Sequence, residues 1–469
     1  MTELRLRMVS FWANLSPHLL PFADVATPDL PLSRLMRLSL FQFSVGMAMV
    51  LLMGTLNRVM IVELGVPASL VGLMVAVPVL AAPFRVLIGH RSDVHQSALG
   101  WRRTPFIWKG SLYQFGGFAI MPFALLVLAG KGESGSLPVW IGQLAAGLSF
   151  LLVGIGIHVV QTTGLALATD LTPERSHPRV VGMMYVTLLI GMLVSGLLFG
   201  TALVNFTPGR LVQVVQAAAV LTLIINTIAI WKQEPRRRGG GAVASTEPGL
   251  KESWRALKQS TAPQVWYLLL GLVGLGTLAF AMADILLEPF GGQVLALDVS
   301  STTRLTAAYA AGGLVGYLVS TTLVGRGLNA ILLAGAGLLL GVFGFAAVIS
   351  AVWLSAGLFL LGNVLIGFCA AVFAHSTLTV TMSRAPRDQA GLALGAWGAV
   401  QATLAGIAMA CAGVGRDLVT WAVAERPTPL LVSSTADGYL VVYALEVVLL
   451  FATLALAVML FRRFDRSLA

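Results

Sequence analysis

The sequence predicts an all-α, polytopic membrane protein with about twelve transmembrane helices in two six-helix halves. Of its 469 residues, 57% are hydrophobic and only 11% are charged, and the mean hydropathy is +0.87. A surface that faces water cannot be built from so apolar a chain. The apolar runs reach about 20 residues, which is the length of a membrane-spanning helix and too long for a barrel strand.

Residues 1–34 precede the first apolar run and contain arginines and prolines but no continuous apolar core. We therefore expect this segment to stay attached rather than to be cleaved as a signal peptide. Its apolar residues, among them Leu4, Met8 and Phe11, recur at helical spacing, so an amphipathic cytoplasmic helix can place one face among lipid headgroups. A solvated arm that packs on its own protein explains the same pattern.

The apolar runs that follow divide into a first half, residues 35–231, and a second half, residues 265–461. We expect spans at 35–57, 68–88, 105–129, 138–168, 180–203, 211–231, 265–287, 302–324, 329–350, 354–380, 390–414 and 438–461. Placing both termini in the cytoplasm puts most of the 30 Lys and Arg residues beside cytoplasmic segments. The same asymmetry accounts for the net charge of +10, so we expect no nucleic-acid partner.

The longest break between apolar runs, residues 232–264, contains consecutive arginines, consecutive glycines and a mixed-charge stretch. We expect a cytoplasmic linker whose charges either attract anionic lipid or dock a partner. Residues 462–469 should form a basic cytoplasmic tail. A weak internal repeat supports the two halves, because residues 173–182 and 386–395 each begin with proline followed by charges and end with glycine.

The connection after the second run contains Asp93 within the sequence GHRSD, and then Arg102 and Arg103 within GWRR. It resembles the signature loop of the major facilitator superfamily, in which glycine permits a tight turn, the aspartate can cap a helix end and the basic pair faces the cytoplasm. Two parallel six-helix units are also that superfamily's architecture. The loop is lengthened here and its second-half counterpart is reduced to residues 325–327, which weakens the case for alternating access. Positive-inside anchoring alone also explains the basic pair.

Three longer segments carry a more specific resemblance: residues 54–64 (GTLNRVMIVEL), 99–108 (LGWRRTPFIW) and 284–292 (DILLEPFGG). With residues 302–307 and 21–24, they are similar to the bacteriochlorophyll-delivery family of the major facilitator superfamily. The resemblance implies an assembly factor for photosynthetic light-harvesting complexes in a bacterial inner, intracytoplasmic photosynthetic membrane. It implies bacteriochlorophyll as cofactor or cargo. It also implies as partners the alpha and beta antenna polypeptides, bacteriochlorophyll or its synthase, and membrane lipids.

Polar residues inside the spans are the candidates for pigment binding, namely His158, Gln161, Asn363, His375 and Glu446. Neutral imidazole can coordinate the magnesium of a chlorin, so His158 and His375, in the fourth and tenth spans, are the candidate ligands; no direct metal site is expected. Hydrogen bonding to a neighbouring helix is the alternative for each residue. Glu446 lies about 12 Å into its span, where it is either a pigment or proton site or a structural hydrogen bond.

Polar pairs at the span ends are candidates for gating: Asn57, Arg58, Asp93, Arg102, Arg103, Asp284 and Glu288. Asp284 and Glu288 share a helix face near the outer boundary. A turn at Pro289-Phe290-Gly291-Gly292 should follow and leave the pair facing water at a helix end. An ion pair between Arg58 and one of these acids, across the two halves, is a hypothesis.

Sequence motifs of catalysis are lacking: we find no phosphate-binding loop, no H-E-x-x-H and no G-x-S-x-G. We therefore expect a protein that is not an enzyme. The leading hypothesis is an assembly factor that binds bacteriochlorophyll and delivers it to antenna polypeptides. The alternative is a major facilitator secondary transporter of a tetrapyrrole or other amphipathic solute, with proton coupling through Glu446 as one form of it.

Overall fold

The computed structural model describes residues 31–82, 85–95, 97, 100–131, 133–173, 176–235, 263–385, 390–424 and 431–466. Within these ranges the chain is helical apart from short turns and connections, and contains no strand, so the predicted all-α fold is confirmed. The expected N-terminal segment lies outside the described residues except for its last four positions. Most of the expected linker also lies outside them.

The first half contains one long π-distorted span and several straight helices. Its elements are α2 (Leu32–Met49), η3 (Val50–Leu56), η4 (Val59–Glu63), α3 (Ala68–Leu80), α4 (Arg85–Val94), α5 (Thr104–Leu128), η6 (Glu133–Ser136), α6 (Val139–Asp170), α7 (His177–Ala202) and α8 (Pro208–Ile230). The first three form a single span that ends at Glu63 rather than at the expected residue 57. Its π-helical turns widen the helix around Asn57 and Arg58, a distortion often found at functional sites.

The second half is built in the same way. Its elements are α10 (Pro263–Ala281), α11 (Ala283–Gln293), α12 (Val299–Gly325), α13 (Ala330–Ser350), α14 (Ala356–Arg384), α15 (Ala390–Ala424) and α16 (Ser434–Arg466). Here α10 and α11 follow each other in one span, Val265–Gln293. The helix α16 continues into the expected basic tail.

Eleven helices in the described part of the chain are long and apolar enough to cross a membrane. The second expected span, residues 68–88, occurs instead as α3, of 13 residues, followed by α4. Proline explains the division, because α3 contains Pro78 and ends shortly before Pro83, and a proline lacks the N–H that continues a helix. Each other expected span corresponds to one membrane-crossing segment, which is a single helix except for the first span and for the span of α10 and α11.

Side-chain caps define where several helices begin. The side chains of Thr207, Asp298 and Asn329 accept hydrogen bonds from backbone N–H groups in the first turns of α8, α12 and α13. These are the residue types that satisfy the free N–H groups of a helix start. Pro208 at the first position of α8 adds a backbone angle that suits a helix.

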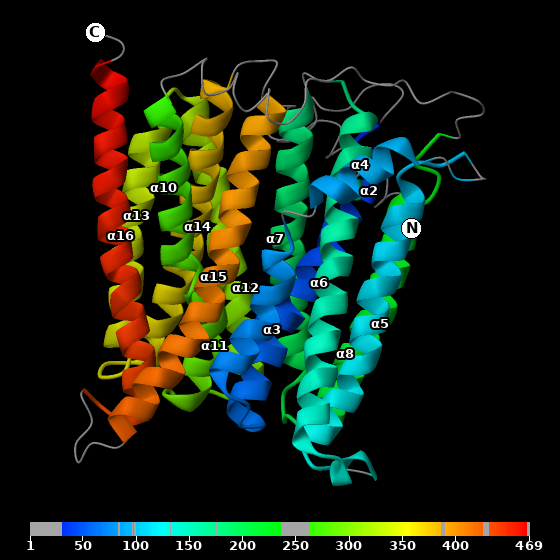
Figure 1. The fold of residues 1–469 in the computed structure, drawn as a ribbon, viewed down its shortest axis with the longest axis vertical. Coiled ribbons are helices and arrows are strands. Elements are labelled where there is room, and N and C mark those ends of the chain that lie inside the picture. Colours follow the sequence, from blue (N-terminus) through cyan, green and yellow to red (C-terminus); the bar gives the residue numbers. More distant parts are fainter. Residues whose placement is uncertain are drawn as a thin grey trace, which may run out of the picture.

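The two halves stand side by side, with α10 to α16 on one side of Figure 1 and α2 to α8 on the other. They meet where α3 packs on α15 and where α7 packs on α12. Glycine permits the first approach, because a Cβ on Gly413 would lie 2.3 Å from the carbonyl oxygen of Ala68. Small residues bring membrane helices together in this way.

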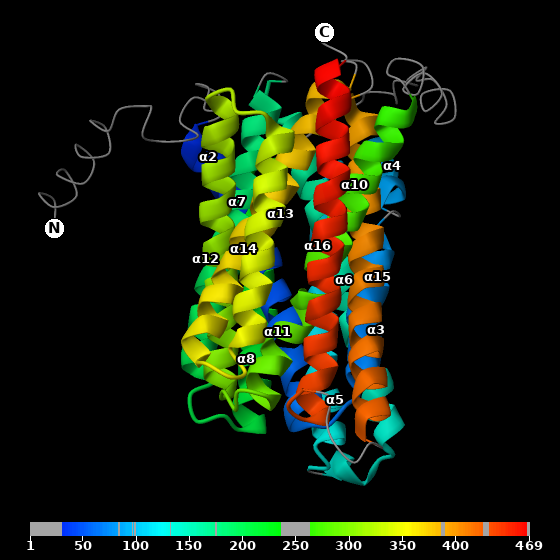
Figure 2. The same cartoon turned by 90° about the vertical axis from the view of Figure 1, so that its left-hand side faces the viewer.

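The beginning of α2 and the end of α8 lie at the same end of the molecule. Arg34 donates from Nε to Gln233 Oε1 at 3.1 Å and from Nη2 to Gln233 O at 2.7 Å. The end of α16 lies at this end as well (Figure 2). We call it the inner end, following the expected orientation with cytoplasmic termini, which remains a prediction from the positive-inside rule.

Candidate functional site

Asn57 and Pro289 join the two halves near the outer end. Pro289 lies inside α11 and has no N–H, so the carbonyl of Ile285, four residues earlier, lacks its usual intrahelical donor. Asn57 is fully buried, and its Nδ2 donates to Ile285 O at 2.7 Å and to Met53 O at 3.0 Å. Because this side chain satisfies the carbonyl, α11 continues to Gln293. The expected turn at residues 289–292 is therefore wrong.

Arg58 makes a second contact between the halves. One guanidinium nitrogen pairs with Glu63, and Nη2 donates to Leu297 O of the second half at 3.0 Å. The ion pair of Arg58 in the structure is thus with Glu63, and its interaction with the hypothesised partner Glu288 is electrostatic without an ion-pair contact. Glu63 follows Arg58 by little more than one turn of the same span, so it reaches the guanidinium without crossing the interface.

The acids of the second half are directed into the bundle. Glu288 is 5% exposed; its Oε1 accepts from the Thr306 hydroxyl, and its Oε2 has no partner. Asp284 is half-buried. The expected water-facing pair at a helix end is therefore wrong, because α11 extends beyond both acids. Glu446 is fully buried, in keeping with its depth in the sequence, and neither of its carboxyl oxygens has a hydrogen-bond partner.

A half-buried arginine organises the polar residues of the first half. Arg85 donates from Nε to His158 Nδ1 at 2.8 Å and from Nη2 to Gln161 Oε1 at 2.6 Å. His158 Nε2 lies 2.7 Å from the carbonyl oxygen of Pro78, so this nitrogen carries the proton and Nδ1 accepts. Both ring nitrogens of His158 are engaged. Arg85 is not among the residues predicted from the sequence, although an arginine inside an apolar run itself signals a polar partner.

His375 lies in a more open setting than His158. Its Nδ1 is 2.8 Å from Ser320 Oγ, and its Nε2 is 3.4 Å from Thr321 Oγ1, beyond a normal hydrogen-bond length. The ring of Tyr317 meets the imidazole edge-on, with centroids 5.1 Å apart. One ring nitrogen of His375 is therefore weakly engaged.

The remaining polar candidates lie apart from one another. Gln161 extends the Arg85 network, since its Nε2 donates to Gln42 Oε1 at 3.2 Å. Asn363 is 2% exposed and donates to Leu305 O at 2.7 Å, which joins α14 to α12. The described residues contain no group of three or more His, Cys, Asp or Glu side chains that could hold a metal ion.

The signature-like loop is held by acids that were not predicted. Glu234, just after α8, accepts from the backbone N–H groups of Arg102, Arg103 and the next residue at 2.7–3.0 Å, and so caps the start of α5. Both arginine side chains also pair with Asp170 at the end of α6. The side chain of Asp93 lies outside the described part of α4. Acids at the ends of apolar runs were the only signal for Glu234 and Asp170.

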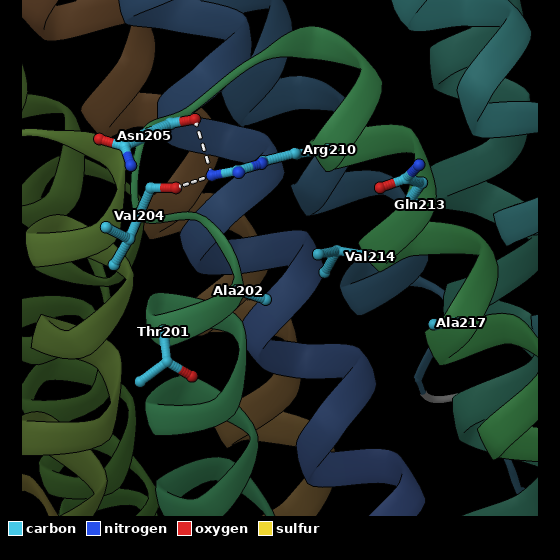
Figure 3. A pocket seen from close by; sticks show the side chains of 8 residues that line it. All are labelled: Thr201, Ala202, Val204, Asn205, Arg210, Gln213, Val214 and Ala217. Atoms are coloured by element: carbon cyan, nitrogen blue, oxygen red, sulfur yellow. Dashed lines mark hydrogen bonds between the residues drawn. The ribbon is translucent and has the colours of Figure 1, made fainter.

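A shallow pocket of about 500 Å³ lies near the outer end between α7 and α8. Arg210 lies in it and donates to the carbonyl oxygens of Val204 and Asn205 (Figure 3). A cation is favourable there because free carbonyls end α7. None of the residues predicted from the sequence lines this pocket.

The fold is that of the major facilitator transporters, and the chain is a multi-pass protein of a bacterial membrane. It superposes with a TM-score of 0.67 and 16% identity on a bacterial homolog of the human lysosomal transporter Spinster, in an inward-facing, unoccupied conformation. The match covers 92% of this chain and 97% of that one. For the nucleoside transporter NupG, the TM-score is 0.60 at 14% identity, covering 90% of this chain and 98% of NupG.

Sequence comparison identifies the family. Residues 55–464 match the family model described as "PUCC protein", so the chain belongs to the PucC family. A PucC protein of Rhodovulum sulfidophilum is 54% identical, covering 89% of this chain and 92% of the relative. A PucC protein of Rhodobacter capsulatus is 52% identical, covering 97% and 98%. A Rhodobacter capsulatus protein named "Bacteriochlorophyll synthase 44.5 kDa chain" is 28% identical, covering 80% and 85%.

Proposed function

We propose that the protein assists the assembly of light-harvesting antenna complexes in the inner photosynthetic membrane of a bacterium. Membership of the PucC family carries this proposal. The resemblance of residues 54–64, 99–108 and 284–292 to the bacteriochlorophyll-delivery family supports it. The protein would bind bacteriochlorophyll and antenna polypeptides and transfer the pigment without chemical change, so no catalytic residues are assigned.

The proposed magnesium ligand is His375. In the tautomer with its proton on Nδ1, this ring donates to Ser320 Oγ at 2.8 Å and leaves the lone pair of Nε2 to a chlorin magnesium. The weak contact of Nε2 with Thr321 at 3.4 Å leaves room for this role. His158 is the poorer ligand, because Arg85 occupies its lone pair. The proposed role of His158 is to orient Arg85.

Pigment absorbance of the purified protein tests this assignment. The full chain is purified in mild detergent from a phototrophic host as wild type, His375→Ala and His158→Ala. We expect the wild type to carry bacteriochlorophyll and the His375→Ala variant to lose most of it. The His158→Ala variant, with a histidine removed from the equivalent helix, should retain pigment in its folded fraction. Full pigment in the His375→Ala protein would reject His375 as the ligand.

Assembly itself is tested in a strain that lacks the gene. We expect antenna absorbance to fall while antenna polypeptides are still synthesised, and antenna polypeptides to co-purify with the wild-type protein. Normal antenna levels in the deletion strain would reject the proposed function.

Transport of a tetrapyrrole or other amphipathic solute is the second candidate. The likeness of the fold to solved transporters favours it. Uptake or efflux by the protein alone in liposomes, without antenna polypeptides, would support transport. Co-purified antenna polypeptides with bound pigment would support assembly.

A further inference from the structure

Where α11 packs on α12 and α16, two acids and two tyrosines interact electrostatically and form what we call the membrane acid cluster: Asp284 of α11, Tyr309 of α12, and Tyr443 and Glu446 of α16. Tyr443 precedes Glu446 by three residues, so the two side chains share a face of α16. Both are fully buried, and neither the tyrosine hydroxyl nor the carboxyl oxygens have a hydrogen-bond partner. The polar side-chain atoms that α16 contributes to the cluster are thus left unsatisfied.

The membrane acid cluster lies deep in the bilayer. Glu446 is about 18 Å from the start of α16 at Ser434, and Asp284 is about 14 Å from the end of α11 at Gln293, at about 1.5 Å per residue. The hydrocarbon core is about 30 Å thick, so Glu446 lies near its middle, and Asp284 lies between the middle and the outer boundary. Water cannot hydrate an ionised Glu446 carboxylate, which is fully buried, unless the helices separate.

Among the described residues, no arginine, lysine or histidine side chain pairs with Glu446. Glu446 interacts electrostatically with Asp284, Tyr309 and Tyr443, and the backbone N–H of Ala283 favours its ionised form. Tyr309 is the side chain that interacts with Asp284. Two other titratable groups face the cluster. Glu288 lies one turn beyond Asp284 and interacts with Arg58 of the first half, and Cys369 of α14 interacts with Tyr309.

An ionised carboxylate that is buried without a cation or hydrogen-bond donors is strongly unfavourable. A second acid within electrostatic range makes it harder for both to ionise at once. In this arrangement, therefore, the stable form of Glu446 is the neutral carboxylic acid. Uptake and release of a proton are its available chemistry.

We propose that Asp284 and Glu446 form a membrane-embedded proton-binding site that keeps α11 packed against α16 and against the first half. The link to the first half is direct. Ile285, next to Asp284, accepts the hydrogen bond from Asn57 at 2.7 Å. Glu288, one turn further on, approaches the first span so closely that a Cβ on Gly54 would lie 2.5 Å from its Oε1. Loss of the protons places like charges between α11 and α16 and so loosens this contact.

Infrared spectroscopy of the full chain in lipid nanodiscs tests the proposal. Protonated carboxylic acids have a C=O stretching band that carboxylates lack. We expect this band in the wild type at neutral pH, and expect it to lose part of its intensity in Glu446→Gln and in Asp284→Asn. The matched control is Glu133→Gln, which changes an exposed acid on η6 and should leave the band unchanged.

Thermal unfolding against pH gives an independent readout. The unfolding temperature of the wild type should fall as the pH rises from neutral. That of the Glu446→Gln variant should fall less, because a glutamine side chain cannot ionise. A wild-type spectrum at neutral pH without a protonated acid band would overturn the proposal, even if the variants fail to fold. A second result would also overturn the proposal: stabilisation of the protein by sodium chloride but not by N-methylglucamine chloride, without a protonated acid band. The acids would then bind a metal cation in place of protons.

Discussion

Asn57→Ala removes the side chain that satisfies the carbonyl of Ile285, and we expect it to destabilise the protein by about 2 kcal/mol. An orphaned buried carbonyl costs about 1–3 kcal/mol. Hydrogen bonds between membrane helices contribute about 0.6 kcal/mol on average and at most about 1.7. The upper part of these ranges applies because Pro289 provides no N–H that could take over from Asn57. Reversible unfolding in bicelles measures the loss.

The rescue by Pro289→Ala separates this reason from simple loss of packing. Alanine at position 289 restores an N–H four residues after Ile285, so the double variant should recover about 1 kcal/mol of what Asn57→Ala loses. Asn363→Ala is the matched control, since Asn363 donates to Leu305 O but Tyr309, not a proline, stands four residues later. Pro289→Ala should leave the cost of Asn363→Ala unchanged. If Asn57→Ala loses the same stability with Pro289→Ala as without it, the reasoning is refuted.

Three further outcomes can be measured by thermal unfolding. Glu234→Ala removes the carboxylate that caps the start of α5 and should lower the free energy of unfolding by about 1–2 kcal/mol. A less cooperative unfolding transition would indicate that the lost cap is responsible. Hydrogen bonds from Ser301 lower the pKa of Asp298. Asp298 thus adds stability above the pKa of the unfolded carboxyl and loses it as pH falls through the folded pKa, so Asp298→Asn should flatten the acid side of the stability profile. His158→Ala leaves Arg85 with one partner fewer and should cost about 2 kcal/mol, whereas equal stability to wild type would contradict the assigned positioning role.

Apolar run length predicted nearly the whole fold, because only helices satisfy the backbone in lipid and each such helix needs about 20 apolar residues. It failed at the second span. Pro78 and the proline at position 83 are apolar enough to keep the hydropathy high, but they interrupt the hydrogen bonds on which a continuous helix depends. Hydropathy therefore predicted one span, whereas the backbone forms two separate helices, α3 and α4.

The polar contacts were only partly predictable. The shared face of His158 and Gln161 follows from their spacing, but their common partner Arg85 comes from another helix and has no fixed spacing to them. Pro289 illustrates the opposite error. Its local sequence indicates a turn, and only Asn57, far away in the chain, supplies the donor that allows α11 to continue. Local patterns cannot reveal a donor that arrives from the other half.

Arg85 is a charged group within the first half on which the membrane potential can act. Its bonded partners are a neutral imidazole and an amide, so the guanidinium keeps its full charge. Through His158 it is tied to a point about 18 Å along α6 from its inner end. An elementary charge crossing the whole field gains about 2.3 kcal/mol per 100 mV. Any movement of the first half that carries Arg85 across a quarter of the bilayer is therefore biased by about 0.6 kcal/mol at that potential, so an energised membrane favours one position of this half over another.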